Sequence, residues 1–216
     1  MYVNKRWGYS VSTIHQDRRA AIVPTRRPHK RAPTTPEKAN DQAEIGSPER
    51  NLDGNVARVV RGVFSKNLEE YLKERGITAQ FFEFAEHTMT VDAAVGRLGV
   101  SRERIIKSML FIDDSGLPVL GIVTGDRRID EKKLALACGA NKVRRANPAE
   151  VKQFTGYDVG AVPPVGHKTK IRTFIDEKVI ALDKVIGGGG EIKMLLEIDP
   201  ADVRRLTNGE VRSIGV

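Results

Sequence analysis

The sequence predicts a mixed α/β domain whose strands pair mostly in antiparallel fashion. From about Asn67 onward, the segments follow in the order helix, strand, helix, hairpin, helix, strand, helix and then several strands. The β-branched and aromatic segment 105–113 is followed by Asp-Ser-Gly and by the apolar segment 117–124, which is typical of a hairpin. The hairpin and the C-terminal strands are too closely spaced for helical crossovers, so simple βαβ winding is not expected.

The composition is that of a globular domain with a tail. The 216 residues are 40% hydrophobic and 30% charged. No apolar run approaches the length of a membrane span, and the N-terminus lacks the apolar core of a secretory signal, so we expect a cytoplasmic protein. The single cysteine, Cys138, excludes an internal disulfide and a multi-cysteine metal site, and we expect it to be a small apolar residue of a helix.

Residues 1–64 are predicted to be a basic, unfolded arm that precedes a domain at 65–216. They hold 12 Lys and Arg against 6 Asp and Glu, together with half of the ten prolines, and show no sustained period. Such an arm could follow nucleic-acid phosphates. The competing explanations are an organelle-targeting peptide and a leader translated from an upstream start codon. We favour these two over nucleic-acid binding, because Trp7 and Tyr9 are the only aromatic residues interleaved with the charges.

Two short capped helices with a strand between them are predicted at the start of the domain. Asn67 is expected to cap a helix that ends at Gly76, and Thr90 a helix that ends at Gly99. The segment 78–84 between them is predicted to be a strand. After these helices, Ser101 and its neighbours are expected to form a turn of helix that leads into the hairpin.

The remaining elements follow from caps, glycine stops and β-branched runs. They are a helix from Asp130 to Gly139, a strand around Val143, a helix capped by Asn147 and Pro148, strands at 170–176 and 178–182, a strand at 191–198, a helix capped by Asp199 and Pro200, and a last strand at 210–214.

One segment is not expected to form regular secondary structure. It is 156–167, Gly-Tyr-Asp-Val-Gly-Ala-Val-Pro-Pro-Val-Gly-His. It contains three glycines and an adjacent proline pair between a helix-like and a strand-like segment. Glycine permits positive φ or close approach of a ligand to the main chain, and proline restricts its neighbours. We therefore expect a shaped loop that forms the floor of a site.

Lys107 is the strongest single candidate for a catalytic or ligand-binding residue. It shares one face of the predicted strand 105–113 with Ile105 and Met109, and the opposite face is apolar as well. A strand that is apolar on both faces is expected to be central, so the lysine must find an anion, a polar cavity or solvent. Lys107 could bind a phosphate or carbonyl oxygen of a ligand at the mouth of a pocket. Alternatively, its stem could pack on the strand while its ammonium reaches water, and the strand sequence alone favours this alternative.

Two histidines and a glycine run are weaker candidates. His167 is either a base or substrate contact or an exposed loop residue, whereas His87 is expected to be structural, with Thr88 or Thr90 as a helix cap. The glycine run 187–190 is expected to be a flexible surface hairpin, with close packing against the ligand loop as the alternative. No phosphate-binding motif is complete and neither histidine has ligands at metal spacing, so no metal and no cofactor are expected.

A side-chain nucleophile is not expected either. Cys138 has no catalytic partner nearby in the sequence, and no serine lies in a strained elbow. If the domain is an enzyme, its chemistry is expected to use backbone groups, a lysine and the substrate itself.

Several segments, in their order and spacing, closely resemble the YbaK/EbsC family, the free-standing relatives of the editing domain inserted in bacterial prolyl-tRNA synthetases. They are Ile-Ile-Lys-Ser-Met-Leu-Phe at 105–111, the segments 127–148 and 155–167, Thr-Phe-Ile-Asp at 173–176, and the glycine run before 191–198. The resemblance covers about residues 67–216 and leaves the arm outside. It implies a mixed, partly barrel-like sheet flanked by short helices.

The resemblance implies a trans-acting aminoacyl-tRNA deacylase, which hydrolyses the ester between a mischarged amino acid and the terminal adenosine of tRNA. Lys107 looks like the family's strand lysine, which holds the terminal nucleotide and orients the ester. Gly160 begins a stretch that looks like the family's GxxxP loop, whose backbone faces the substrate carbonyl and the attacking group. In the family that group is water or the substrate's own side chain, assisted by a ribose hydroxyl, so catalysis rests on positioning and electrostatics.

The site residues that the resemblance implies fall into two sets. Lys107 and Gly160 are the implied catalytic residues. The implied substrate-binding residues are Thr90, Ser108, Ala161, Val162, Pro163, Pro164, Gly166, His167, Gly188 and Gly189. The implied partner is the acceptor end of aminoacyl-tRNA, with prolyl-tRNA synthetase as a further candidate and no membrane.

Departures from the family's subgroups bear on the amino acid. The alanine-specific subgroup has a His-Pro pair where this chain has 187–190, and an asparagine where it has Ser108, so alanyl editing is not expected. In the cysteine-specific subgroup the residue at His167 is commonly glutamine, so a Cys-tRNA(Pro)-like substrate is a candidate only. The Pro-Pro-Val-Gly-His form is similar to the EbsC-like branch, for which the resemblance gives no firm substrate.

Two other classes of function stay open. One is a non-catalytic module of the same fold that binds tRNA or a synthetase. The other is a nucleic-acid chaperone that acts through residues 1–64, whose binding would depend strongly on salt.

Overall fold

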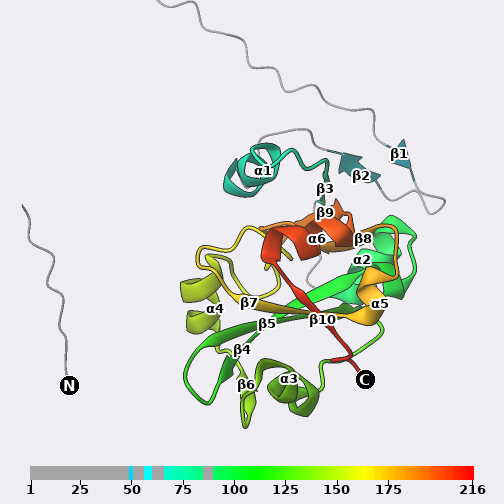
Figure 1. Ribbon diagram of the computed structural model, residues 1–216. Helices are drawn as coiled ribbons and strands as arrows, with labels where there is room; N and C mark the ends of the chain where they lie inside the picture. The colour runs from blue at the N-terminus through cyan, green and yellow to red at the C-terminus, as the bar shows by residue number, and fades with distance from the viewer. Residues whose placement is uncertain (1–48, 51–55, 60–65, 85–89) are drawn as a thin grey trace, which may run out of the picture. The chain divides into compact units, whose positions relative to one another are not determined.

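The computed structural model describes residues 49–50, 56–59, 66–84 and 90–216, and all of them lie in the unit Asp41–Val216 (Figure 1). Most of the predicted arm and the loop that contains His87 and Thr88 are outside the described residues. Two short strands lie within the range assigned to the arm, so its boundary at residue 64 stays a prediction.

The described elements are helices of eight residues or fewer and strands of eight residues or fewer. The helices are α1 (Lys66–Lys73), α2 (Val91–Leu98), the 3-10 turn η1 (Arg102–Arg104), α3 (Glu131–Cys138), α4 (Pro148–Thr155), α5 (Glu177–Ile180) and α6 (Pro200–Thr207). The strands are β1 (Glu49–Arg50), β2 (Val56–Val59), β3 (Gln80–Glu83), β4 (Ile106–Asp113), β5 (Pro118–Thr124), β6 (Val143–Arg145), β7 (Arg172–Asp176), β8 (Val185–Gly188), β9 (Met194–Ile198) and β10 (Glu210–Arg212).

The strands form two five-stranded sheets, in the orders β1-β2-β3-β9-β8 and β10-β7-β5-β4-β6. Among the described strands, only the pairings of β7 with β5 and with β10 are parallel. The mixed α/β class with mostly antiparallel pairing is therefore confirmed. The expected barrel-like character is wrong, because the strands divide between two sheets and do not close.

Apolar clusters join the sheets and cover both faces of the second one. The largest cluster packs Ile122 of β5 against Leu196 of β9 and Val203 of α6, and all three are buried. The opposite face of the second sheet buries Phe174 beneath Leu134 of α3. Figure 1 shows α6 and α3 on opposite sides of this sheet. Burial on both faces explains why β4 and β5 read as almost continuous apolar runs.

Helix caps predicted from sequence are present at most helices. The side chains of Thr90 and Asp130 accept hydrogen bonds from the first turns of α2 and α3, and Asn147 forms a full capping box with Glu150 at α4. The predicted cap at Asn67 is wrong, because α1 already begins at Lys66. Helix boundaries commonly shift by one or two residues when no cap geometry fixes them.

The predicted strand at 178–182 is also wrong, because α5 occupies Glu177–Ile180. The Asp176 carboxylate accepts a hydrogen bond from the main-chain N–H of Lys178 at 3.2 Å and so caps a helical turn. Val179 is fully buried whereas Lys178 is exposed, which suits one helical turn packed on the core. The next strand is β8, which includes the first two glycines of the run 187–190.

None of the helices in the described part of the chain has the length and apolarity that a membrane crossing requires.

Replacing the α4 cap, Asn147→Ala, should lower the free energy of unfolding by about 1 kcal/mol, because the N-terminal N–H of Glu150 loses its acceptor. Chemical denaturation would measure the change. Gln153→Ala, at an exposed position of the same helix, is the control and should stay within about 0.5 kcal/mol of the original protein. Equal losses in both variants would contradict the assigned cap.

Candidate active site

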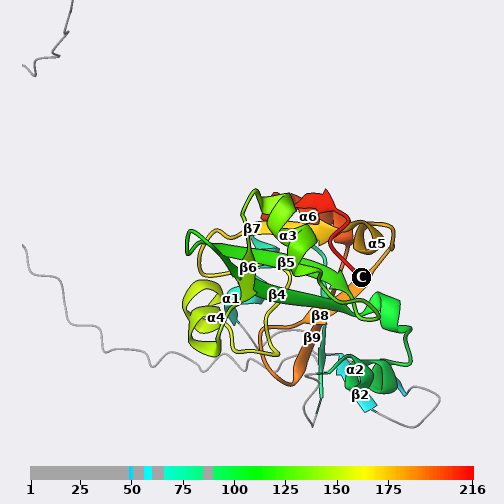
Figure 2. The same cartoon turned by 90° about the horizontal axis from the view of Figure 1, so that it is seen from below.

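A pocket of about 320 Å³ lies along the edge of β4. β5 pairs with β4 over Ile106–Ile112, but β6 pairs only with Phe111–Asp113, so the first half of β4 has an edge that β6 leaves uncovered. Ile105 forms a parallel bridge with Ile186 next to this edge, and Figure 2 shows β8 beside β4. The expectation of a central strand is therefore met over only part of β4.

The pocket is formed by β4 and β8, with α2 and the loop before β7 beside them. Six of the residues implied by the resemblance line it: Thr90, Lys107, Ser108, Gly160, Val162 and Gly188. Six others are not among its lining residues: Ala161, Pro163, Pro164, Gly166, His167 and Gly189. The structure therefore brings together positions that lie up to about a hundred residues apart, and the roles of all twelve remain predictions.

The Lys107 ammonium donates hydrogen bonds to the main-chain carbonyls of Gly125, at 3.1 Å, and of Arg127. These carbonyls belong to the turn that follows β5. Burial lowers the pKa of Lys107, and the nearby cations Arg128 and Arg102 act in the same direction, whereas Asp126 raises it. An ammonium has three donors, so the two carbonyls leave one for a ligand in the pocket.

Ser108 contributes polar groups to an otherwise apolar wall. Its hydroxyl is buried and has no hydrogen-bond partner among the described residues, although the residue lines the pocket. Its main-chain groups face the open edge as well, because Ile105 accepts from Gly125 on the β5 side and Leu110 accepts from Ala146 on the other. A buried hydroxyl without a partner is costly, so a bound ligand with a polar atom would relieve that cost.

The loop at 156–167 has the shape that its glycines and prolines predict. Gly160 takes φ +91 and lines the pocket, and among the described hydrogen bonds none uses its N–H. Ala161 follows directly, is 1% exposed, and accepts a hydrogen bond from Gly190 at 3.0 Å. The loop is therefore fixed to the glycine run through the main chain, as a packed wall.

The glycine run is packed and is not the flexible surface hairpin that we expected. A Cβ added at Gly188 would lie 2.6 Å from the Val162 carbonyl oxygen and 2.9 Å from that of Ala161. A Cβ at Gly187 would lie 3.1 Å from the side chain of Ile106. The alternative, close packing of this run against the loop, is therefore correct.

His167 lies behind the loop. It is half-buried, and its Nε2 lies 2.9 Å from the Pro163 carbonyl oxygen. Burial lowers the pKa of the imidazole, while the bond to Pro163 opposes this shift. A neutral ring donates its Nε2–H to that carbonyl, so His167 supports the proline pair from outside the pocket and is not an exposed loop residue.

Arg145 and Val159 are pocket residues that the sequence did not indicate. Arg145 is the last residue of β6, pairs with Phe111 of β4 and lines the pocket, and its exposed guanidinium lies 3.8 Å from the carboxylate of Glu131 in α3. Val159 is 50% exposed at the lip. Arg145 lies at the pocket because of the pairing register between β4 and β6. That register cannot be predicted from a single sequence.

The lining residues include no Asp, Glu, His or Cys. Within the described residues, no group of three or more such side chains is placed to hold a metal ion. Cys138 ends α3 with its thiol directed to the Ala135 carbonyl, away from the pocket. The groups that the pocket offers to a ligand are thus a cation, main-chain groups and hydroxyls. Such groups suit a ligand with phosphate or ester oxygens.

The fold and the pocket are those of an editing domain that acts on aminoacyl-tRNA, and comparison with known proteins supports this class. The aminoacyl-tRNA editing domain family matches residues 85–206, more than half of the chain, so the chain belongs to this family. The YbaK/EbsC grouping expected from the sequence is confirmed.

Relatives of two kinds are found among curated proteins. A candidate Cys-tRNA(Pro)/Cys-tRNA(Cys) deacylase, EbsC of Enterococcus faecalis, is 27% identical over 150 residues, which are 68% of this chain and 92% of that protein. A proline–tRNA ligase of Maridesulfovibrio salexigens is 35% identical over 102 residues, which are 47% of this chain but only 17% of the ligase.

Solved structures show the same fold. The crystal structure of a candidate trans-editing enzyme for prolyl-tRNA synthetase superposes with a TM-score of 0.65 at 30% identity, covering 70% of this chain and 96% of that one. The hypothetical protein APE2540 gives a TM-score of 0.66 at 33% identity, covering 70% and 100%.

Gly188→Ala should lower the free energy of unfolding by about 1–3 kcal/mol, because the added methyl group meets two carbonyl oxygens of the loop. Gly96→Ala is the matched control: no atom lies within 4 Å of its added Cβ, and alanine in a helix should stabilise by about 0.5–1 kcal/mol. Thermal unfolding measures both. A neutral effect of Gly188→Ala would refute the close packing described here.

His167 should make stability depend on pH. Its folded-state pKa is lowered, so its contribution is fully present above the ordinary value of about 6.5 and is lost as the pH falls through the folded-state pKa. Between about pH 7.5 and about pH 5, the original protein should therefore lose more unfolding free energy than His167→Gln, which cannot titrate. Parallel curves for the two proteins would contradict the neutral, buried imidazole.

Proposed function

We propose that this protein is a trans-acting aminoacyl-tRNA deacylase, which hydrolyses the ester of mischarged tRNA. One observation carries the proposal: Lys107, Ser108 and Gly160 line one pocket whose lining residues include no carboxylate, histidine or cysteine. Family membership and the names of the relatives support the same chemistry.

In the proposed mechanism the terminal adenosine and its ester enter along the open edge of β4. The free N–H donor of Lys107 holds a phosphate or ester oxygen, and the main chain at Gly160 faces the carbonyl carbon. A water molecule attacks that carbon, the bond to the ribose oxygen breaks, and the proton from water ends on the ribose oxygen. Fixed dipoles and a fixed cation stabilise the charge that develops on the carbonyl oxygen, which is catalysis by preorganisation.

We propose a small amino acid as the substrate's acyl group, with Cys-tRNA(Pro) as the first candidate. The pocket is mostly apolar, which suits a small and weakly polar side chain such as that of cysteine. The name of the Enterococcus relative points to the same acyl group. The partners would then be the acceptor end of tRNA and, functionally, prolyl-tRNA synthetase, whose products the protein would correct in the cytoplasm.

A panel of mischarged tRNAs tests the function. The protein should release the amino acid from at least one of them, and Lys107→Ala should slow that release about 100-fold or more, the range for removing one group that stabilises an oxyanion. Lys132→Ala, an exposed lysine of α3, should leave the rate unchanged. Ester release would be followed by acid-precipitable radiolabelled tRNA.

Absence of release from every tRNA in the panel would overturn the proposal. If the protein nevertheless bound tRNA and Lys107→Ala bound equally well, the non-catalytic binding module would be the better description.

A further inference from the structure

Asp176 is a buried carboxylate that accepts four hydrogen bonds, and the proposed mechanism does not use it. The residue ends β7 and is 0% exposed. Its Oδ1 accepts hydrogen bonds from Arg127 Nη1 at 2.5 Å and from the Lys178 N–H, and its Oδ2 accepts from the N–H groups of Ile214, at 3.0 Å, and Gly215, at 2.7 Å. A buried carboxylate with four donors holds together the segments that supply them.

Arg127 links this carboxylate to the turn after β5. Its guanidinium donates through Nη1 to Asp176 and through Nη2 to the Gly215 carbonyl at 2.8 Å, and its side chain is only 19% exposed. The flanking main chain is held as well, because Arg128 and Val216 exchange two hydrogen bonds and the N–H of Asp130 donates to the Ile214 carbonyl. The fork geometry of arginine thus fixes both the guanidinium and the backbone that carries it.

The same turn supplies the two carbonyl oxygens that hold the Lys107 ammonium, those of Gly125 and Arg127. On its other side Gly125 has no room to move, since an added Cβ would lie 2.5 Å from the Arg102 carbonyl oxygen and 2.7 Å from the side chain of Val91. The carbonyls are therefore fixed by packing at Gly125 and by the ion pair at Arg127.

We propose that Asp176 and Arg127, with the segment 214–216, are positioning residues that hold the Lys107 ammonium at the pocket. They touch Lys107 only through the main chain of the turn, and the ion pair keeps the Arg127 guanidinium directed away from the pocket. The catalytic meaning of this arrangement rests on the proposed function, but the arrangement itself can be tested without it.

Gly215→Ala is the variant that tests the positioning role of Arg127 most directly. Its Cβ would lie 2.8 Å from Arg127 Cζ and 2.9 Å from Nη1, so it displaces the guanidinium without changing any charge. Only the end of a flexible side chain has to shift, so the domain should still fold. Gly209→Ala is the matched control, because its Cβ is as crowded as that of Gly215→Ala but meets the side chains of Ile175 and Thr207 and not that of Arg127.

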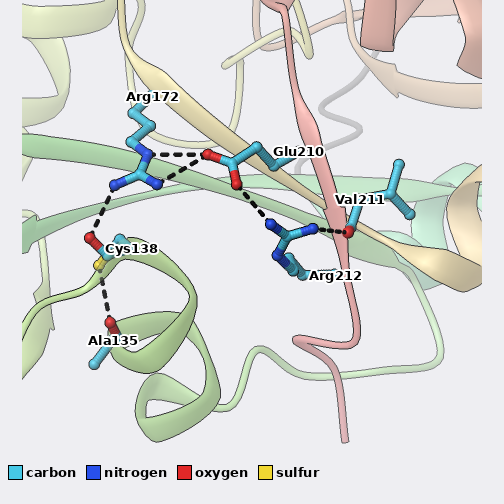
Figure 3. A network of polar contacts seen from close by, with 6 residues as sticks. All are labelled: Ala135, Cys138, Arg172, Glu210, Val211 and Arg212. Carbon is cyan, nitrogen blue, oxygen red and sulfur yellow. Dashed lines mark hydrogen bonds and ion pairs between the residues drawn. The ribbon is translucent and has the colours of Figure 1, made fainter.

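Asp176→Asn is the second variant, and Glu210→Gln, on the neighbouring strand β10, is its control. Glu210 accepts from Arg172, at the opposite end of β7, and from Arg212, in a network that also reaches the Cys138 carbonyl (Figure 3). This network ties β7, β10 and α3 together without touching the Lys107 turn.

The readout is the rate at which an amine-selective reagent labels Lys107 in the full chain, followed by peptide mass spectrometry at one fixed pH. Holding the pH constant keeps the surrounding charges of Asp126, Arg128 and Arg102 the same in every sample. Gly215→Ala and Asp176→Asn should raise the rate about fivefold or more, the factor that corresponds to loss of one hydrogen bond. Both controls should stay within about twofold of the original protein.

Unchanged labelling in folded Gly215→Ala would overturn the proposal, and so would an equal rise in Gly209→Ala, which would indicate general loosening. If Asp176→Asn does not fold, Gly215→Ala decides alone. In the deacylation assay Gly215→Ala should lower kcat about fivefold and leave KM unchanged, since tRNA contacts elsewhere are intact. A protein without deacylase activity would remove the proposed function, while the labelling result would still decide the positioning.

Discussion

A cation in the middle of an apolar strand has to be surrounded by oxygen atoms, and the region around β4 is arranged to meet that requirement. Lys107 obtains two carbonyls from the turn after β5 and keeps one donor for the pocket. The turn is fixed because Gly125 packs without free space and Arg127 is held by the buried Asp176. The ammonium is thus preorganised by main chain, which costs no rearrangement when a ligand binds.

The opposite wall of the pocket depends on backbone packing as well. Gly188 lets β8 approach the carbonyls of Ala161 and Val162, and Gly160 adopts a positive φ at the lip. Pocket walls made of main chain tolerate changes of side chain around them but tolerate no added Cβ at these glycines. His167, for which the sequence allowed a role as base or substrate contact, supports that wall from behind.

The sequence predicted most elements because caps and glycine stops act locally, as Thr90 and Asn147 do. It failed at 178–182, where the side chain of Asp176 and the burial of Val179 override β-branched composition. Motif resemblance indicated Lys107 and Gly160, because they lie in contiguous signatures. Arg145, and the links from Asp176 to Arg127, could not be predicted, since each depends on strand register or on contacts between distant segments.

The short length of β6 has a consequence for how the sheet is completed. Three paired residues end its contact with β4, and the main-chain groups of Ser108 are left facing a cavity where a longer strand would have run. Under the proposed function, a substrate would lie in place of the missing strand, and its polar atoms would pair with the main-chain groups that the chain leaves unpaired there. The ligand would then act as part of the sheet, at an edge that an extension of β6 along β4 would otherwise cover.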